Sequence, residues 1–204
     1  MPRYAAGVQE LTDEQRERMS TYLDLLEAAN ARMNLTRIRD RADAETFHVG
    51  DALKLLPFLP SWPFPLADVG SGGGVPGMVL AIARPDVEVM LIESVTKKAE
   101  FLRETAETIG LTNVRVHNGR AERLPYEQFD IVTSRAVAPL EKLLVLCRPL
   151  VRAGGSLLAM KGPKLNEELE AAMPILKKQR ATVTTHPYDL GGQTGRIIAK
   201  ISYL

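Results

Sequence analysis

Apolar and polar residues follow two different patterns on either side of Leu66. Before it, apolar residues recur at the spacing of amphipathic helices. Thr12 and Gln15 have the spacing of a capping box, which predicts a helix from about 13 to 32, and a second helix is expected near 42–56. From Leu66 onward, short apolar runs alternate with longer amphipathic stretches, which is typical of an α/β protein.

Prolines between positions 57 and 65 separate the two patterns. Because proline interrupts regular structure, they predict a boundary between an N-terminal helical part, 1–60, and a larger unit, 61–204. Strands are predicted at 66–69, 87–92, 113–117, 129–133, 155–160, 181–186 and 196–202. Helices are predicted between most of them, at 76–83, 95–109, 138–151 and 165–179.

This alternation predicts a doubly wound, Rossmann-like α/β fold with an N-terminal helical extension. The seven strand candidates would form a mostly parallel sheet with helices on both faces. The last two candidates are joined without a helix. A hairpin at that point would put one antiparallel strand into the sheet.

A glycine-rich segment from Asp68 to Gly77 follows the first predicted strand and opens a predicted helix. Glycines there allow a tight turn and let a ligand lie against bare backbone, beside the free N–H groups of the helix N-terminus. Gly72, Gly74 and Gly77 match the dinucleotide pattern G-x-G-x-x-G, which is weak evidence by itself.

Two details favour S-adenosylmethionine over NAD as the ligand of this segment. The run Asp68-x-Gly70-x-Gly72-x-Gly74 resembles methyltransferase motif I, whose acidic residue lies near the amino-acid part of the cofactor. Pro76 removes an N–H group that a pyrophosphate would use. S-adenosylmethionine has no phosphate and loses nothing.

Two further segments fit a nucleoside. Glu93 ends the second predicted strand about 20 residues beyond the glycines, where an acid grips the ribose hydroxyls in nucleoside-binding α/β folds. After the third strand, the loop that contains Ala121 and Glu122 would lie beside the adenine, and its N–H groups could read the ring edge. A plain surface loop is an equally good interpretation of that segment.

The reaction chemistry is expected after the fourth strand, at Ser134-Arg135-Ala136. That segment lacks the Asn/Asp-Pro-Pro-aromatic motif common in enzymes that methylate exocyclic amines. Cys147 lies in an apolar run and is interpreted as a buried, inert thiol rather than a nucleophile. What remains is an acceptor that is already nucleophilic, such as guanine N7, which needs positioning rather than a general base.

Several segments together resemble the ribosomal small-subunit methyltransferase G family, also called glucose-inhibited division protein B. They are Met33-Asn34-Leu35-Thr36, His48-x-x-Asp51-Ala52-Leu53, the run from Asp68 to Gly77, Glu93-Ser94-x-x-Lys97-Lys98-x-x-Phe101-Leu102, Arg120-Ala121-Glu122, Ser134-Arg135-Ala136, Lys161-Gly162 and Gly195-Arg196. They run in family order from about 33 to 196. Lys98, where the family often has arginine, and Gly73-Gly74-Val75 are mild departures.

The resemblance implies an S-adenosylmethionine-dependent class I methyltransferase that modifies N7 of one guanine in the decoding-region hairpin of 16S rRNA. The substrate would be naked rRNA, a precursor particle or the small ribosomal subunit. The cofactor-binding residues that the resemblance implies are Gly70, Val75, Ala121, Glu122 and Arg135. The glycine loop and the end of the second strand add Asp68, Gly72, Gly74, Glu93 and Ser94 to the expected cofactor site. The implied surround of the target guanine is Asn34, Arg120, Arg135 and Arg196.

The residues also allow plainer interpretations. Arg135 could pair with Asp130 or another acid, and Asn34 could cap the turn after the first helix. His48 and Asp51 lie one helical turn apart and could pair only with each other. Two further residues could be ordinary members of strands, namely Lys161 at a strand exit and Arg196 on the hairpin.

Composition narrows the class of protein further. The net charge of +1 neither supports nor excludes nucleic acid, but Arg32, Arg37, Arg39 and Arg41 form a local basic cluster. One cysteine and three scattered histidines predict no disulfide and no metal site. The chain has no long apolar run and no apolar signal core at its N-terminus, which predicts a cytoplasmic protein without a membrane span. A monomer is expected.

Three other functions remain open on the sequence alone. One is a methyltransferase that acts on a small molecule or a protein, although the arginines favour a polyanion. Another is an S-adenosylmethionine-binding ribosome assembly factor without catalysis. The third is a NAD-dependent oxidoreductase.

Overall fold

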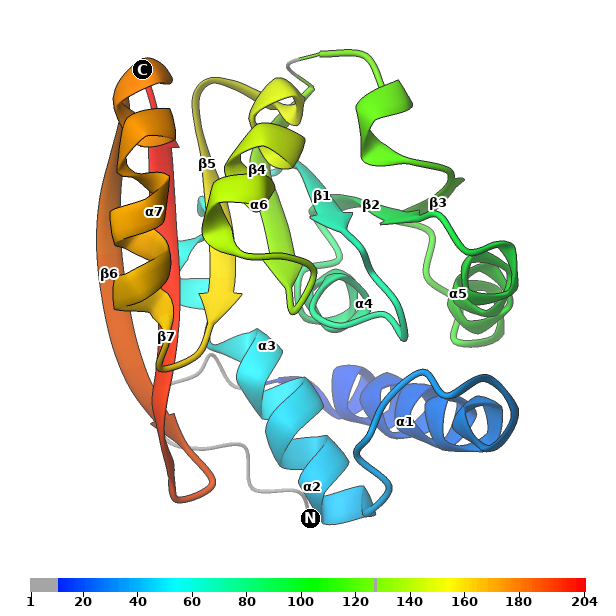
Figure 1. Ribbon diagram of the computed structural model, residues 1–204. Helices are drawn as coiled ribbons and strands as arrows, with labels where there is room; N and C mark the ends of the chain where they lie inside the picture. Colours follow the sequence, from blue (N-terminus) through cyan, green and yellow to red (C-terminus); the bar gives the residue numbers. More distant parts are fainter. Residues whose placement is uncertain (1–10, 127) are drawn as a thin grey trace.

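The computed structural model describes residues 11–126 and 128–204. Its described strands form one sheet in the order β3-β2-β1-β4-β5-β7-β6 (Figure 1). They are β1 (Pro65–Val69), β2 (Glu88–Glu93), β3 (Val114–Asn118), β4 (Phe129–Arg135), β5 (Val151–Lys161), β6 (Ala181–Leu190) and β7 (Gln193–Tyr203). The pairs among β1 to β5 are parallel, and β7 is antiparallel to both β5 and β6. The predicted hairpin and its single antiparallel strand are therefore confirmed.

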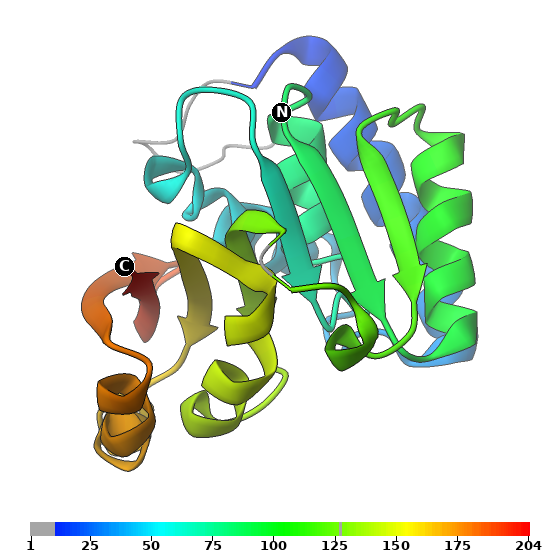
Figure 2. The same ribbon diagram turned by 90° about the horizontal axis from the view of Figure 1, so that it is seen from above.

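Helices cover both faces of the sheet (Figure 2). The N-terminal part contains α1 (Asp13–Met33), the helical run α2 (Arg41–Ala44), η1 (Glu45–Gly50) and α3 (Asp51–Leu53), and the turn η2 (Leu56–Phe58). The later elements are α4 (Gly77–Ala83), α5 (Thr96–Thr108), η3 (Ala121–Arg123), α6 (Leu140–Cys147), η4 (Arg148–Leu150) and α7 (Leu165–Lys178). One apolar core lies between the sheet and α1, α4 and α5, and a second lies under α6 and α7.

Helix α1 is part of the first core. The predicted capping box is present, since Gln15 N donates to Thr12 Oγ1 (3.2 Å) and Thr12 N donates to Gln15 Oε1 (2.9 Å). The Gln15 amide also donates to the carbonyls of Ile82 and Ala83 at the end of α4. The buried stripe of α1 consists of Met19, Tyr22, Leu23, Leu26 and Ala29. The N-terminal helices therefore share one apolar core with the sheet. The predicted domain boundary at position 60 stays a prediction.

The second predicted helix, 42–56, is the element that differs most from expectation. It ends at Leu53, and its middle is a π-helical turn, η1. A π turn differs from an α turn by closing i→i+5 instead of i→i+4 hydrogen bonds, and a stretch of six residues is too short for apolar spacing to show this difference. Similarly, the helix expected at 138–151 ends at Cys147, where a 3-10 turn contains Pro149, which lacks the N–H group needed to continue it.

Within the described ranges, no helix combines the length and the apolar character that crossing a bilayer would need.

Candidate active site

The candidate site lies at the carboxyl ends of β1 and β4. The strand order reverses between these neighbours, and ligands bind at such a switch point in open α/β sheets. Gly70 follows β1, and Arg135 ends β4. Both line a cavity of about 150 Å³ together with Thr36 and His48 from the N-terminal part. In Figure 1, the arrow of β5 ends close to the helical run 41–53, so this run lies across the same edge of the sheet.

The glycine loop after β1 needs its glycines for geometry. Gly70, Gly72 and Gly74 have φ of 74°, 55° and 102°, values that disfavour other residues. A Cβ atom at Gly70 would lie 2.4 Å from Val137 of the loop after β4. A Cβ atom at Gly77 would lie 2.3 Å from a Leu91 methyl group, so only glycine lets α4 approach the sheet this closely.

Tyr22 of α1 forms a hydrogen bond with the backbone of this loop. Its hydroxyl donates to the Gly73 carbonyl at 2.8 Å, and its ring is fully buried. Burial also raises the pKa of the hydroxyl, so Tyr22 stays a neutral donor. Leu26, one turn further along α1, lies close to Gly73. The conformation of the glycine loop therefore depends on α1 as well as on the sheet.

The buried Asp68 side chain links the glycine loop to β4 through hydrogen bonds. Its carboxylate accepts hydrogen bonds from Gly77 N and Thr133 Oγ1, both at 3.1 Å, and it is only 1% exposed. Burial raises the pKa of this carboxyl to about 6. Both carboxylate oxygens are thus engaged within the fold, which fits a structural contribution to the loop.

Glu93 links the loop to the end of β2. Its Oε2 accepts from Gly72 N (3.0 Å) and its Oε1 from Val95 N (2.8 Å), and it is 7% exposed. Each carboxylate oxygen has a further lone pair, so Glu93 can still accept hydrogen bonds from a diol. Its backbone carbonyl accepts from Gly119 N at 3.0 Å, which connects it to the loop after β3. In that loop, Ala121 is buried and Glu122 is exposed, while Ser94 is exposed beside Glu93.

Asp51 of α3 holds two arginines and a tyrosine together. Its Oδ2 lies 3.2 Å from the Arg135 guanidinium and 2.8 Å from that of Arg196. Its Oδ1 accepts from the Tyr188 hydroxyl at 2.6 Å. The carboxylate is 1% exposed, so these partners replace water as its hydrogen-bond donors. Arg135 also donates to the Phe47 carbonyl at 2.8 Å.

A polar cleft of about 890 Å³ opens beside this cluster. Arg135, Arg196, Tyr188 and Lys161 line it. The Lys161 amine is anchored, because it donates to Glu168 at 2.6 Å and to the Ala138 carbonyl at 2.7 Å. The cleft is large enough for a nucleobase. Three arginines line it, Arg37, Arg135 and Arg196, against two acidic residues, Asp51 and Glu168.

His48 lies between Arg135 and the loop after α1. Its Nδ1 is 3.2 Å from Arg135 Nη2, and its Nε2 is 3.0 Å from Thr36 Oγ1. Burial, and then the positive charge of Arg135, lower the pKa of the imidazole to about 4. The ring is therefore neutral near pH 7.

The structure separates the alternatives that the sequence left open. Asp130 pairs with Arg152, so the partner of Arg135 is Asp51. The interpretation that His48 and Asp51 pair only with each other was wrong, because each contacts Arg135. Sequence reasoning named Asp51 without finding this role.

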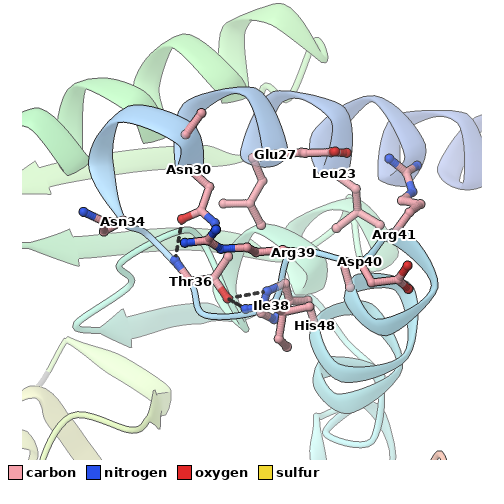
Figure 3. A pocket seen from close by; sticks show the side chains of 13 residues that line it. Leu23, Glu27, Asn30, Asn34, Thr36, Ile38, Arg39, Asp40, Arg41 and His48 are labelled. Atoms are coloured by element: carbon pink, nitrogen blue, oxygen red, sulfur yellow. Dashed lines mark hydrogen bonds between the residues drawn. The ribbon is translucent and has the colours of Figure 1, made fainter.

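Asn34 and Arg120 lie apart from the arginine pair. Asn34 caps α1 in a left-handed conformation (φ 49°), which confirms the capping interpretation. It also lines a neighbouring cavity of about 400 Å³ (Figure 3), in which its side chain points away from Thr36 and His48. Arg120 is exposed at the start of the turn after β3 and is not among the residues that line the cleft.

Metal-ligating side chains do not gather in groups of three or more anywhere in the part of the chain that the structure describes.

Known structures place this fold in one class. A SAM-dependent methyltransferase from Aquifex aeolicus superposes with a TM-score of 0.61 at 17% identity, covering 82% of this chain and 96% of that one. Pyrococcus horikoshii TYW2, solved in complex with MeSAdo, gives a TM-score of 0.56 at 16% identity over 69% of this chain and 57% of that one. At these identities the likeness shows the fold, which is the doubly wound α/β fold of class I methyltransferases and agrees with the predicted fold class.

Sequence comparison narrows the class to one family. The family model for rRNA small subunit methyltransferase G matches residues 15–192. Relatives named ribosomal RNA small subunit methyltransferase G are 45% identical in Sorangium cellulosum (89% of this chain, 77% of the relative) and 40% identical in Chloroflexus aggregans (94% and 84%). The chain belongs to the ribosomal RNA small subunit methyltransferase G family.

Proposed function

We propose that the protein transfers a methyl group from S-adenosylmethionine to N7 of one guanine in the decoding-region hairpin of 16S rRNA. One observation carries the proposal: the glycine loop after β1 and Arg135 at the end of β4 line the same cavity, which adjoins the large polar cleft. A cofactor on the loop and a base in the cleft would meet there.

The residues around the loop suit the cofactor. The Glu93 carboxylate would accept hydrogen bonds from the ribose hydroxyls, and the N–H groups at Ala121 and Glu122 would border the adenine. Four further residues, Gly70, Gly72, Gly74 and Val75, would form the floor beneath the amino-acid part. Ser94 beside Glu93 and Arg135 across the cavity complete the proposed cofactor site. Asp68 would contribute by fixing the loop, given its contacts with Gly77 and Thr133.

The distribution of arginine pairs supports a polyanionic substrate. Several arginines away from the site are ion-paired with nearby acids, namely Arg16, Arg18, Arg84 and Arg152. Arg32, Arg37, Arg39 and Arg120 have no ion-pair partner among the described residues, as is also true of Arg103, Arg115, Arg123 and Arg180, and Arg37 lines the cleft itself. Unpaired guanidinium groups are available to phosphates, which they bind in a planar, two-pronged geometry. This favours RNA over a small molecule or a protein substrate.

The proposed chemistry needs positioning more than acid–base catalysis. S-adenosylmethionine would supply a methyl group bound to a positively charged sulfur. The guanine N7 lone pair would attack the methyl carbon in line as the carbon–sulfur bond breaks, so that S-adenosylhomocysteine leaves and the positive charge passes to the purine. N7 carries no proton, so no residue has to remove one. Arg135 and Arg196, held by Asp51, would orient the base, and Asn34 and Arg120 would contact the RNA around it.

Incubation with methyl-labelled S-adenosylmethionine tests the proposal. The acceptors are 16S rRNA and small ribosomal subunits that lack the modification, and N7-specific cleavage maps the product. Label at a single guanine N7 is expected, and the more active acceptor identifies the natural substrate. S-adenosylhomocysteine binding without label in either acceptor would instead favour a non-catalytic assembly factor. We expect the active species to be a cytoplasmic monomer.

A further inference from the structure

A hydrogen-bond chain from Arg135 through His48 fixes the role of the Thr36 hydroxyl. A guanidinium group has donors only, so His48 Nδ1 accepts from Arg135 Nη2. A neutral imidazole carries one proton, which must then lie on Nε2. The contact between His48 Nε2 and Thr36 Oγ1 (3.0 Å) is therefore a donation to the threonine.

Thr36 Oγ1 is consequently saturated as an acceptor. Besides His48, the Ile38 N–H group donates to it at 3.1 Å, and a hydroxyl oxygen has two lone pairs. The Thr36 backbone is also pinned, because its N–H donates to Asn30 Oδ1 at 2.9 Å. Figure 3 shows these contacts converging on Thr36. The hydroxyl hydrogen has no acceptor among the residues that the structure describes, so Thr36 can act toward a ligand only as a donor.

This donor occupies the junction of the candidate site. Thr36 and His48 line the polar cleft, the cavity of about 150 Å³ at the glycine loop, and the cavity of Figure 3. Between the proposed methyl donor at Gly70 and the proposed base in the cleft, Thr36 therefore offers one oriented O–H group.

We propose that the Thr36 hydroxyl donates a hydrogen bond to O6 of the target guanine and so selects guanine over adenine. The inference rests on the proposed function. Guanine presents the O6 acceptor on the same edge as N7, whereas adenine presents an amino donor at that position. A hydroxyl that can only donate forms a hydrogen bond with guanine O6. It faces another donor in adenine and disfavours binding of that base. His48 and Arg135 act through Thr36 by holding its lone pairs.

The test compares two variants on two RNAs. Thr36→Val removes the hydroxyl at nearly constant shape, and Thr36→Ser keeps it. The acceptor carries either guanine or 2-aminopurine at the methylated position, and 2-aminopurine keeps N7 but lacks O6. Each ratio compares two enzymes on the same RNA, so the intrinsic reactivity of N7 cancels.

Thr36→Val should lower kcat/KM on the guanine RNA by about 3- to 10-fold more than on the 2-aminopurine RNA, the usual effect of one lost neutral hydrogen bond. A loss common to both RNAs reports the His48 and Ile38 donors that valine leaves without an acceptor, and Thr36→Ser should restore the value on guanine. Equal losses on both RNAs, or no loss on guanine, would overturn the assignment. S-adenosylhomocysteine affinity and Tm, measured for each variant, show whether the fold is intact. If the wild-type protein does not methylate the guanine, the proposed function fails and the assignment with it.

Discussion

Asp51 and Arg135 are 84 positions apart in the chain, yet the guanidinium nitrogen of one lies 3.2 Å from the carboxylate of the other. The carboxylate is almost fully buried, and the arginine side chain is 22% exposed. This pair joins the N-terminal helices to the sheet at the point where the cleft opens.

Asp51→Asn should therefore disturb the cleft and the fold together. Removing the charge leaves the two guanidinium groups at one wall without their shared partner, which should lower the free energy of unfolding by about 2 kcal/mol. Methyl transfer should fall at least about tenfold, because Arg135 loses its orientation. Urea unfolding and methyl incorporation measure the two effects.

Asp130→Asn is the matched control for Asp51→Asn. It breaks the half-exposed pair with Arg152, far from the cleft, and should change stability by less than about 1 kcal/mol with normal activity. Equal losses in the two variants would show that the Asp51 cluster has no special part in the site.

The hydroxyl of Tyr22 offers a test of how α1 supports the glycine loop. Tyr22→Phe removes the hydrogen bond to Gly73 and should cost about 1 kcal/mol of stability. It should also weaken S-adenosylhomocysteine binding, measured by calorimetry, because the loop loses a restraint. Tyr126→Phe is the control, since Tyr126 is 76% exposed. Unchanged affinity in Tyr22→Phe would mean that the sheet alone holds the loop.

Glu93→Gln should weaken cofactor binding specifically. The amide puts a donor next to the Gly72 or Val95 N–H group, and one acceptor for the ribose is lost. We expect S-adenosylhomocysteine affinity to fall by about 10-fold or more, as for the loss of a charged hydrogen bond. Glu88→Gln, at the exposed start of the same strand, should bind normally. A normal affinity in Glu93→Gln would contradict the proposed ribose contact.

The lowered pKa of His48 predicts how stability depends on pH. Between about pH 6.5 and 4, His48 is protonated in the unfolded chain but stays neutral in the folded protein. The contribution of His48 to stability is therefore fully favourable above pH 6.5 and is lost as the pH falls toward 4, by about 3 kcal/mol at most. The difference in unfolding free energy between wild type and His48→Gln should shrink over this window. A difference that stays constant with pH would contradict a neutral, buried His48.

Asp68 should produce the opposite slope. Its pKa is raised to about 6, so the folded protein binds the extra proton between about pH 4 and 6, and stability falls as the pH rises through that range. The two groups partly cancel in the wild-type protein. The difference in unfolding free energy between wild type and Asp68→Asn, measured in urea at about pH 4.5, 5.5 and 6.5, should therefore shrink as the pH rises. A difference that grows with pH would contradict a raised pKa for Asp68.

Cys147→Ala separates direct transfer from nucleophilic catalysis. The thiol is fully buried in the core under α6, and burial raises its pKa, so it cannot serve as a thiolate in the cleft. Methyl incorporation per folded protein should stay near normal, with about 1 kcal/mol lost in stability. Arg135→Ala should nearly abolish incorporation under the same assay. An inactive but folded Cys147→Ala protein would exclude direct attack.

The fold and the glycine loop could be predicted because both are local in sequence. Alternating short and long apolar runs predict strands and helices, and the loop is one continuous run of glycines next to a strand. Glu93 was found because its distance from the loop is fixed by one helix and one strand. Each of these signals is contained within about 30 residues, the length of a βαβ unit.

The Asp51 cluster could not be predicted in the same way. Its members come from a helix, a parallel strand and a hairpin, and no periodicity relates residues so far apart in the chain. The spacing of one helical turn left open that His48 and Asp51 pair only with each other, but it carries no signal for Arg135, which contacts both. The supporting role of Tyr22 was hidden because a buried tyrosine on a helix stripe resembles any other core residue.

The position of Tyr188 and Arg196 on the last hairpin has a consequence for biosynthesis. Asp51 leaves the ribosome long before its partners on β6 and β7, so during synthesis its carboxylate must stay hydrated or be held by Arg135 alone. The cleft wall is complete only after residue 196 has emerged. A nascent chain shorter than this can already contain the glycine loop, but it lacks Arg196 from the cleft wall.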